Sequence, residues 1–179
     1  MTNELLKEPL IYRNNPRLYV VIGFFASIFI VGGFVIGFRR GDWSFLAQMA
    51  GATAVLFLLL RVLRLEIRTD GFKYRNLTGS RKVEFADVSR AYLNVVRAEA
   101  VPQGVAVFWV ERKDGSKVKI NLRTFPVEAA AILVTALESH GIHVEVPDAS
   151  AAQQFEKQVR AAQLELGISS AKQHKSKVP

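Results

Sequence analysis

The sequence predicts a membrane-anchored α+β protein, in which an N-terminal helical hairpin precedes a β-rich domain closed by helices. Two long uncharged stretches, residues 18–38 and 43–60, stand side by side near the start of the chain. From residue 63 onward, apolar and charged residues alternate with the period of half-buried strands. After residue 124 the apolar spacing changes to three and four, the period of an amphipathic helix. The predicted units are an N-terminal segment (1–17), a transmembrane hairpin (18–63), a β domain with a capping helix (64–147), a second helix (148–166) and a disordered basic tail (167–179).

The two uncharged stretches are long enough to cross a membrane. A hydrocarbon core about 30 Å thick needs about 20 apolar helical residues. The first stretch supplies 21 residues and the second 18, and Gln48 is the one amide of the second. A cleaved signal peptide is the alternative, but its apolar core spans only about 7 to 15 residues. We therefore expect two transmembrane helices.

Basic residues flank the hairpin mainly on one side. Eight Lys or Arg residues lie just before the first stretch or just after the second, against Arg39 and Arg40 in the connecting loop. Because an excess of positive charge marks the cytoplasmic side of a membrane, we expect both termini in the cytoplasm. Arg39 and Arg40 run against this rule, since both must be translocated. Tyr12 and Tyr19 at one boundary and Trp43 at the other suit the headgroup level.

Small residues recur at helical spacing inside the hairpin. Gly33 and Gly37 form a GxxxG pair, and Ala47 with Gly51 forms a second pair of small residues four apart. Such pairs let helix backbones approach closely in lipid. They predict packing within the hairpin, with a homo-oligomer interface as the alternative. We expect Gln48 to form a hydrogen bond across to a neighbouring helix.

Six strands are predicted after the hairpin. The first two alternate on either side of Asp70-Gly71, which is typical of a tight β-hairpin turn. A third strand around Val83 follows the turn at residues 76–80. The remaining three are expected at residues 89–98, 105–112 and 117–122.

Two helices are predicted after the strands. Thr124 is the expected cap of the first, Pro126 fits its first turn and Gly141 ends it. Its apolar stripe, spaced by three and four, consists of Ala130, Leu133, Val134 and Leu137. The second helix has a narrow stripe that favours packing over membrane binding. That stripe consists of Ala151 or Ala152, Phe155, Val159, Ala162 and Leu166.

The order of elements, with the segments Thr69-Asp70-Gly71-Phe72 and Gly79 to Val88, resembles the bacterial pleckstrin-homology-like domains. The resemblance covers roughly residues 63–146 and implies a strongly bent antiparallel barrel capped by its C-terminal helix. Many such domains follow two N-terminal membrane helices, which implies a bacterial inner-membrane protein. Eukaryotic members bind phosphoinositides with basic residues around the loop joining their first two strands. That loop is only Asp70-Gly71 here, so we expect no headgroup site of that type.

The residues give no support for an enzyme, a metal site or a cofactor. The chain has no Cys, which excludes thiolate catalysis and disulfides, and it has no glycine-rich phosphate loop. His140 and His143 straddle Gly141, so surface positions are expected rather than a shared metal. Asp70, Asp87 and Asp114 each lie at a predicted turn, where Asp bonds backbone N–H groups. We interpret Trp109 as a core residue.

Excess positive charge is the remaining functional signal. Residues 61–125 contain fourteen Lys or Arg and seven Asp or Glu, and the formal net charge of the whole chain is +8. No nucleic-acid-binding motif accompanies this charge, and membrane topology explains it, so nucleic acid is not an expected partner.

The sequence supports a non-enzymatic scaffold or regulatory module that binds a protein partner at the membrane. Direct binding of anionic lipid is the first alternative. Its candidate headgroup contacts are Arg61, Arg64, Arg68, Arg81 and Lys82. A subunit that contributes to a shared enzyme or transporter site is the second alternative.

Overall fold

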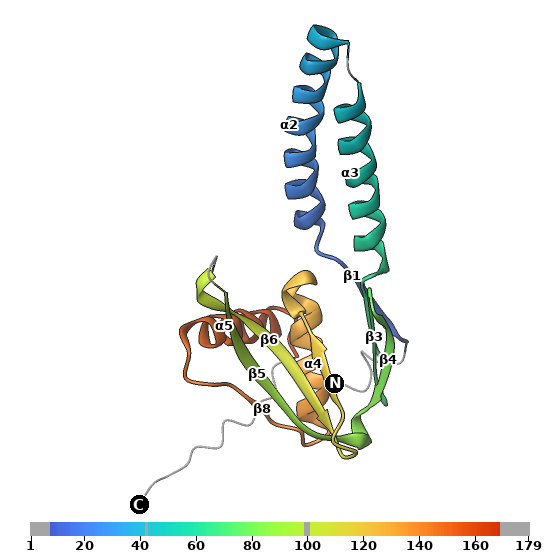
Figure 1. The fold of residues 1–179 in the computed structure, drawn as a ribbon. Helices are drawn as coiled ribbons and strands as arrows, with labels where there is room; N and C mark the ends of the chain where they lie inside the picture. Colours follow the sequence, from blue (N-terminus) through green and yellow to red (C-terminus); the bar gives the residue numbers. More distant parts are fainter. Residues whose placement is uncertain (1–7, 42, 99–100, 169–179) are drawn as a thin grey trace, which may run out of the picture.

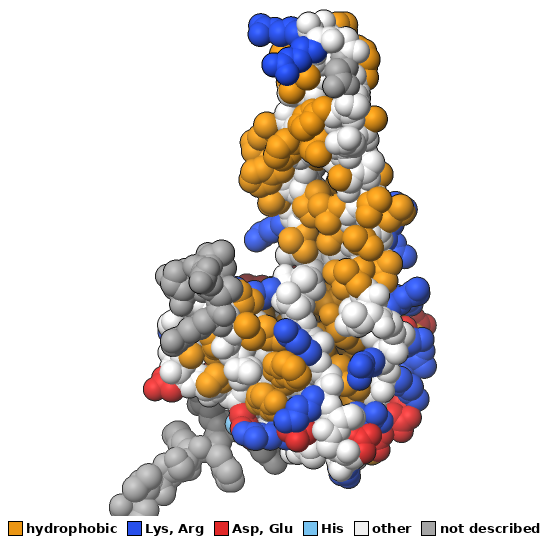
Figure 2. All heavy atoms as spheres, viewed as in Figure 1, with side chains coloured by type: hydrophobic (Ala, Val, Ile, Leu, Met, Phe, Trp, Pro, Cys, Tyr) orange, Lys and Arg blue, Asp and Glu red, His pale blue; other side chains and the backbone are white. Residues whose placement is uncertain are grey.

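The computed structural model describes residues 8–41, 43–98 and 101–168. Two apolar helices, α2 (Pro16–Arg40) and α3 (Ser44–Val62), form a hairpin that projects from a β domain (Figure 1). Both are long and apolar enough to cross a membrane, and little of either is buried by the rest of the chain. Apolar side chains accordingly cover much of the hairpin surface (Figure 2). The prediction of two long apolar helices is confirmed.

The first sheet includes a strand from each side of the hairpin. Its four antiparallel strands are, in spatial order, β1 (Leu10–Arg13), β2 (Arg64–Ile67), β3 (Gly71–Asn76) and β4 (Gly79–Glu84). Strand β1 precedes α2, and its partner β2 follows α3. The sheet therefore joins the two ends of the hairpin. Strands β2, β3 and β4 confirm the prediction, whereas β1 lies in a segment for which no strand was predicted.

The second sheet is mixed. Its strands are, in spatial order, β7 (Lys117–Ile120), β6 (Val101–Arg112), β5 (Val88–Ala98) and β8 (Val144–Glu145). Strand β8 runs parallel to β5, whereas the other pairs are antiparallel. The predicted strands are confirmed, although β6 starts four residues earlier than expected. Strand β7 ends sooner than predicted, because the 3₁₀ turn η2 (Leu122–Thr124) follows it. Strand β8 was not predicted.

The closed barrel that the resemblance implied is wrong. No described strand pairs with strands of both sheets, so each sheet keeps two edges. The 3₁₀ turn η1 (Phe85–Asp87) separates β4 from β5 and redirects the chain into the second sheet. Helix α4 (Val127–Ser139) then packs into the space between the sheets (Figure 1). In a closed barrel, hydrogen bonds between strands would join the two sheets. In this protein the side chains of α4 fill the space between the sheets instead.

Helix α4 forms part of one core with both sheets. Its predicted stripe is buried, together with Leu65 of β2 and Phe108 of β6. The N-cap is Pro126 rather than the predicted Thr124, whose hydroxyl donates to the carbonyl of Asn121 instead. The helix gives way to a turn before Gly141, which adopts a φ of +76° as a C-terminal glycine does.

Helix α5 (Ser150–Glu165) is the predicted second helix and packs on the protein itself. It contacts α4, β5 and β6, and buries Phe155 and Val159. The expected packing is thus confirmed for most of its stripe. Leu166 is an exception, because it lies past the end of the helix and is 42 % exposed. Of the predicted disordered tail, residues 169–179 lie outside the described residues.

Candidate functional site

Basic side chains dominate the outer face of the first sheet. Leu65 and Ile67 of β2 enter the core, so Arg64 and Glu66, which alternate with them, point to the opposite face. The register adds side chains from the neighbouring strands to that face. We call the following set the basic face: Arg13, Arg64, Arg68, Lys73, Arg75 and Lys82. Figure 2 shows Lys and Arg side chains gathered along the first sheet, starting at the base of the hairpin.

Glu66 lies in the middle of the basic face and is nearly buried, with 8 % of its surface exposed. The Nε of Arg68 donates a 2.8 Å hydrogen bond to its Oε1, and the Nη2 of Arg64 lies 3.5 Å from its Oε2. The hydrogen bond from Arg68, with the charges of Arg68, Arg64 and Lys73, lowers the pKa of Glu66 despite its burial. Glu66 is therefore a carboxylate that positions two arginines.

Three arginines stand in one register row at the end of the basic face nearest the hairpin. Arg13 of β1 is the partner of Arg64, which is in turn the partner of Arg75 of β3. Cross-strand partners lie on the same face of a sheet, about 5 Å apart. We call these three residues the arginine row. Arg13 and Arg75 form no ion pair within the part of the chain that the structure describes.

The structure brings together only part of the predicted lipid-contact set. Arg61 lies in the last turn of α3, beside Arg64 at the base of the hairpin. Arg68 lies at the far end of β2, about 13 Å further along the strand. Arg81 is the partner of Tyr74, so it lies on the core side of β4, where it is nevertheless exposed.

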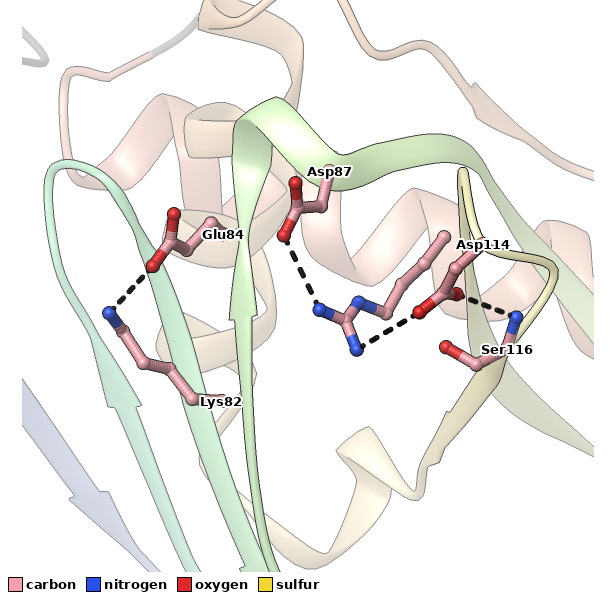
Figure 3. Close-up of polar contacts among 6 residues, drawn as sticks. Lys82, Glu84, Asp87, Asp114 and Ser116 are labelled. Carbon is pink, nitrogen blue, oxygen red and sulfur yellow. Dashed lines mark hydrogen bonds and ion pairs between the residues drawn. The ribbon is translucent and has the colours of Figure 1, made fainter.

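The fifth member, Lys82, is engaged with an acidic neighbour. Its Nζ lies 2.8 Å from an oxygen of Glu84, which raises the pKa of Lys82 (Figure 3).

The place of Arg13 in the basic face was not predicted from the sequence. The alternation in Leu10-Ile11-Tyr12-Arg13 was the available signal, but it is only four residues long.

Two hydrogen bonds fix the base of the hairpin to the domain. The side-chain amide of Asn14 donates to the carbonyl of Leu60 in the last turn of α3, at 2.7 Å. The backbone N–H of Asn15 donates to the carbonyl of Thr124 at 2.8 Å. These bonds, together with the pairing of β1 and β2, set the orientation of the first sheet relative to the two apolar helices.

The four small residues that were predicted to pack the helices fall into two groups. A Cβ added to Gly33 would lie 3.1 to 3.3 Å from atoms of Leu46, and one added to Gly37 would lie 2.7 Å from the Trp43 ring. Both therefore face the second helix of the hairpin. Gly51 faces open space, and Ala47 is exposed, so packing through these two residues stays a prediction that needs another chain. Gln48 is likewise exposed, and no hydrogen bond joins it to a described residue.

A smaller polar cluster forms where the turns of the two sheets meet (Figure 3). The guanidinium of Arg112 lies 3.3 Å from Asp87 and 3.6 Å from Asp114. Asp114 also accepts a 2.8 Å hydrogen bond from the backbone N–H of Ser116. The backbone of Lys113 donates to the carbonyl of Asp87. These contacts tie η1 to the β6–β7 turn, which gives the cluster a structural function.

The outer face of the second sheet presents two aromatic rings. Tyr92 and Trp109 are register partners, with Arg90 over the Tyr92 ring and Lys119 over the Trp109 ring. Trp109 is only partly buried and lies outside the core, so its interpretation as a core residue is wrong. Strand alternation explains the difference, because Phe108 and Val110 on either side of it point inward.

The described residues hold no metal site, and their hollows include a small apolar pocket and a wide recess of about 670 Å³ that opens to solvent between β5 and residues 147–150. Residues 8–41, 43–98 and 101–168 hold no group of three or more His, Cys, Asp or Glu placed to bind a metal ion. An apolar pocket under α5, lined in part by Leu93, Phe108 and Phe155, has an interior of about 20 Å³, enough for about one water molecule. The basic face is therefore the best-developed candidate site in this part of the chain.

Comparisons with protein-family models, with curated proteins and with solved structures find no match for this chain. The resemblance to pleckstrin-homology-like domains stays a prediction from the sequence. The basic face, the sheet edges and the apolar hairpin are therefore the features from which a function can be inferred.

Proposed function

We propose that this chain is a non-enzymatic adaptor of the bacterial inner membrane, with both termini in the cytoplasm. The apolar hairpin anchors the β domain, and the domain binds a protein partner at the membrane surface. The excess of basic residues beside the hairpin supports the cytoplasmic orientation. The sequence resemblance to bacterial pleckstrin-homology-like domains, many of which follow two membrane helices, supports the location.

The free edge of β4 is the observation on which the protein-binding proposal depends. Strand β4 is last in the order of the first sheet, and five of its six residues are exposed. Exposed edge strands can take up an extended peptide through main-chain hydrogen bonds, and neighbouring side chains supply specificity. Arg81 and Lys82 lie on this edge, and Lys73 is the register partner of Lys82. We therefore propose an extended acidic segment as the occupant.

Because the hairpin anchors the β domain, a weak interaction at the β4 edge is sufficient to bind a partner in the same membrane. A tether replaces three-dimensional search by an effective local concentration in the millimolar range for short linkers. Here the sheet follows α3 directly, because β2 starts at Arg64 and α3 ends at Val62. A membrane-bound partner would therefore meet the β4 edge at a fixed height above the bilayer.

Site-specific photo-cross-linking in native membranes tests this function. A photoreactive residue replaces Arg81 at the edge, and in the control it replaces Lys113, an exposed residue at the β6–β7 turn of the second sheet. We expect a discrete cross-linked protein from position 81 that is absent from position 113. The charge reversal Lys82→Glu should abolish it. Equal labelling from both positions, or labelling that survives the reversal, would contradict the proposal.

A further inference from the structure

The arginine row places three like charges side by side, and among the described residues a single carboxylate, that of Glu66, is ion-paired with it. Arg13, Arg64 and Arg75 come from three strands and share one face through the register of β1, β2 and β3. Like charges directly opposite one another destabilise a sheet. The charge of Glu66 does not serve the row alone, because its 2.8 Å hydrogen bond is with Arg68, and its contact with Arg64 is 3.5 Å. The row therefore holds unbalanced positive charge in the described structure.

Arg64 also retains unused hydrogen-bonding capacity. A guanidinium has five N–H donors in a planar fork that suits phosphate oxygens. The Nε of Arg64 is buried without a hydrogen-bond partner among the described residues, and its side chain is 43 % exposed. The accessible part of the fork is therefore its outer nitrogens, of which Nη2 lies 3.5 Å from Glu66.

The position of the arginine row, close to the end of the apolar helices, indicates which kind of anion could bind it. The apolar part of α3 ends at Leu60, and Arg64 follows four residues later, so the row lies within about 10 Å of the end of the hydrocarbon-spanning segment. Arg13 lies three residues before α2 and is at the same height through its pairing with Arg64. The headgroup layer on each side of a bilayer is about 5 to 8 Å thick. Lipid phosphates are therefore the anions nearest the row.

We propose that Arg13, Arg64 and Arg75 form a binding site for the phosphodiester headgroup of an anionic phospholipid. This inference rests on the membrane anchoring proposed above and adds a site that is separate from the β4 edge. Ser80, the register partner of Arg75, extends the row with a hydroxyl group. The site lies on the outer face of the sheet, away from the Asp70-Gly71 turn. Lipid bound there neutralises the row and holds the sheet against the membrane.

The test measures which lipids the full-length protein retains. The purified chain is reconstituted in nanodiscs that contain equal amounts of phosphatidylglycerol and phosphatidylcholine, and the retained lipids are counted by native mass spectrometry. We expect the wild-type chain to retain phosphatidylglycerol preferentially. The variant Arg13→Gln/Arg75→Gln should lose this preference by about fivefold for each arginine removed, the factor that corresponds to about 1 kcal/mol per basic group at the surface.

A charge-matched variant distinguishes a site from general positive charge. Lys113→Gln/Lys117→Gln removes the same two charges at the β6–β7 turn, outside the basic face, and we expect it to keep the preference. An equal loss in both variants, or a wild-type chain without preference, would overturn the site. The conservative variant Arg13→Lys/Arg75→Lys covers the case in which the glutamine variant does not fold. It keeps the charge but not the fork, and should retain part of the preference.

Two further measurements separate this inference from its premises. Soluble glycerophosphoglycerol presents the same phosphodiester without acyl chains, and if it displaced the retained lipid, the site would be one for free anions. Carbonate extraction of native membranes tests the anchoring alone. A chain that resists extraction but shows no lipid preference would contradict the arginine-row site and leave the proposed anchoring intact.

Discussion

The side-chain amide of Asn14 caps the end of the second apolar helix, by donating a 2.7 Å hydrogen bond to the carbonyl of Leu60. Leu60 belongs to the last turn of α3, where carbonyl groups lack partners within the helix. Asn14 itself precedes the first helix and is 5 % exposed. One buried side chain thus joins the entry of the hairpin to its exit, at the level where the first sheet begins.

Replacing Asn14 should loosen the base of the hairpin. In Asn14→Leu the carbonyl of Leu60 loses its side-chain donor and keeps the backbone N–H of Leu63, at 3.2 Å, so we expect the free energy of unfolding to fall by about 1 kcal/mol. Thermal denaturation of the full-length chain in detergent, followed by circular dichroism, measures the effect. Asn94→Leu is the control, because Asn94 is exposed on the second sheet. Equal stability of the two variants would contradict the capping function.

Gly32 and Gly33 are neighbours on α2 that should respond differently to the same substitution. A Cβ at Gly33 would come within 3.2 Å of the Leu46 backbone, whereas one at Gly32 meets nothing within 4 Å. Gly33→Ala must push the helices apart, at about 1 to 3 kcal/mol for overpacking. Gly32→Ala should be neutral or slightly stabilising, because alanine favours the helix. Unfolding in detergent micelles, monitored by helical circular dichroism, compares the two, and a similar loss in both would exclude specific packing at Gly33.

Glu66 should make the stability of the domain sensitive to acid. Its pKa is lowered in the folded protein from an ordinary value of 4.5, chiefly by the hydrogen bond from Arg68. Because the folded pKa is lower than the unfolded one, the stabilisation is fully present above about pH 4.5 and is lost as the pH falls through the folded pKa. Glu66→Gln removes it at every pH, and we expect a loss of about 1 kcal/mol at pH 7, since Arg68 is half exposed.

Melting temperatures measured from pH 7 down to pH 3 test this expectation. The difference between the wild-type chain and Glu66→Gln should shrink as the pH falls. The matched control is Glu84→Gln, which removes a carboxylate that is half exposed and paired with Lys82 alone among the described residues. A difference that stayed constant with pH would mean that Glu66 stabilises the sheet by packing rather than by charge.

Local periodicity was sufficient to predict most elements of this chain. Long uncharged stretches marked α2 and α3, and alternation around Asp70-Gly71 marked the hairpin of β2 and β3, because each pattern lies within one contiguous segment. The missing strands are short and depend on distant partners. Strand β1 pairs with a strand more than fifty residues away, and β8 has only two residues. The prediction of a closed barrel was wrong for a similar reason, because pairing between the edges of two sheets depends on the whole fold.

The candidate site was predictable only in part. The sequence indicated a basic surface near the membrane and identified Arg61 and Arg64 at the base of the hairpin. It could not show that Arg68 is drawn to Glu66, because a hydrogen bond between residues two apart depends on their sharing a sheet face. Nor could it place Arg13 beside Arg64, since that register requires β1. Sequence proximity to the hairpin was a poor guide, because strands carry residues away from the base of the hairpin at about 3.3 Å per residue.

Gly71 should be intolerant of any side chain. A Cβ there would lie 2.2 Å from the carbonyl oxygen of Val83 and 2.9 Å from the Cα of Glu84, both of which are backbone atoms of the adjacent strand. Gly71→Ala must therefore separate β3 from β4, and we expect it to lower the free energy of unfolding by about 3 kcal/mol or more. Gly115→Ala is the comparison: it meets open space and carries only the strain of a φ of +79°, about 1 to 2 kcal/mol.

Thermal denaturation of both glycine variants in detergent gives the order of the two effects. If Gly115→Ala proved the more damaging, the close approach of β3 and β4 at Gly71 would be wrong. If the two were equal, a small shift of β4 would relieve the clash at Gly71, because Gly71, unlike Gly115, does not have a positive φ.

Gln163 and Thr135 should be coupled energetically, because they form a buried polar link between α5 and α4. The amide of Gln163 donates a 2.8 Å hydrogen bond to the hydroxyl of Thr135, which in turn donates to the carbonyl of Ala131. Both residues are at most 3 % exposed. In Thr135→Val the amide of Gln163 loses its acceptor in the core, which should lower the free energy of unfolding by about 1 to 3 kcal/mol.

The double variant Thr135→Val/Gln163→Leu distinguishes this link from simple packing. It removes both partners, so no buried amide is left without an acceptor, and we expect it to be more stable than the sum of the two single changes predicts. Chemical denaturation of the four chains gives the coupling energy. Arg160 also donates to Gln163, at 3.0 Å, so the Gln163→Leu change releases that guanidinium to its ion pair with Glu138. A coupling energy near zero would mean that α5 is held on α4 by apolar contacts such as those of Phe155, and that the polar link contributes nothing to its docking.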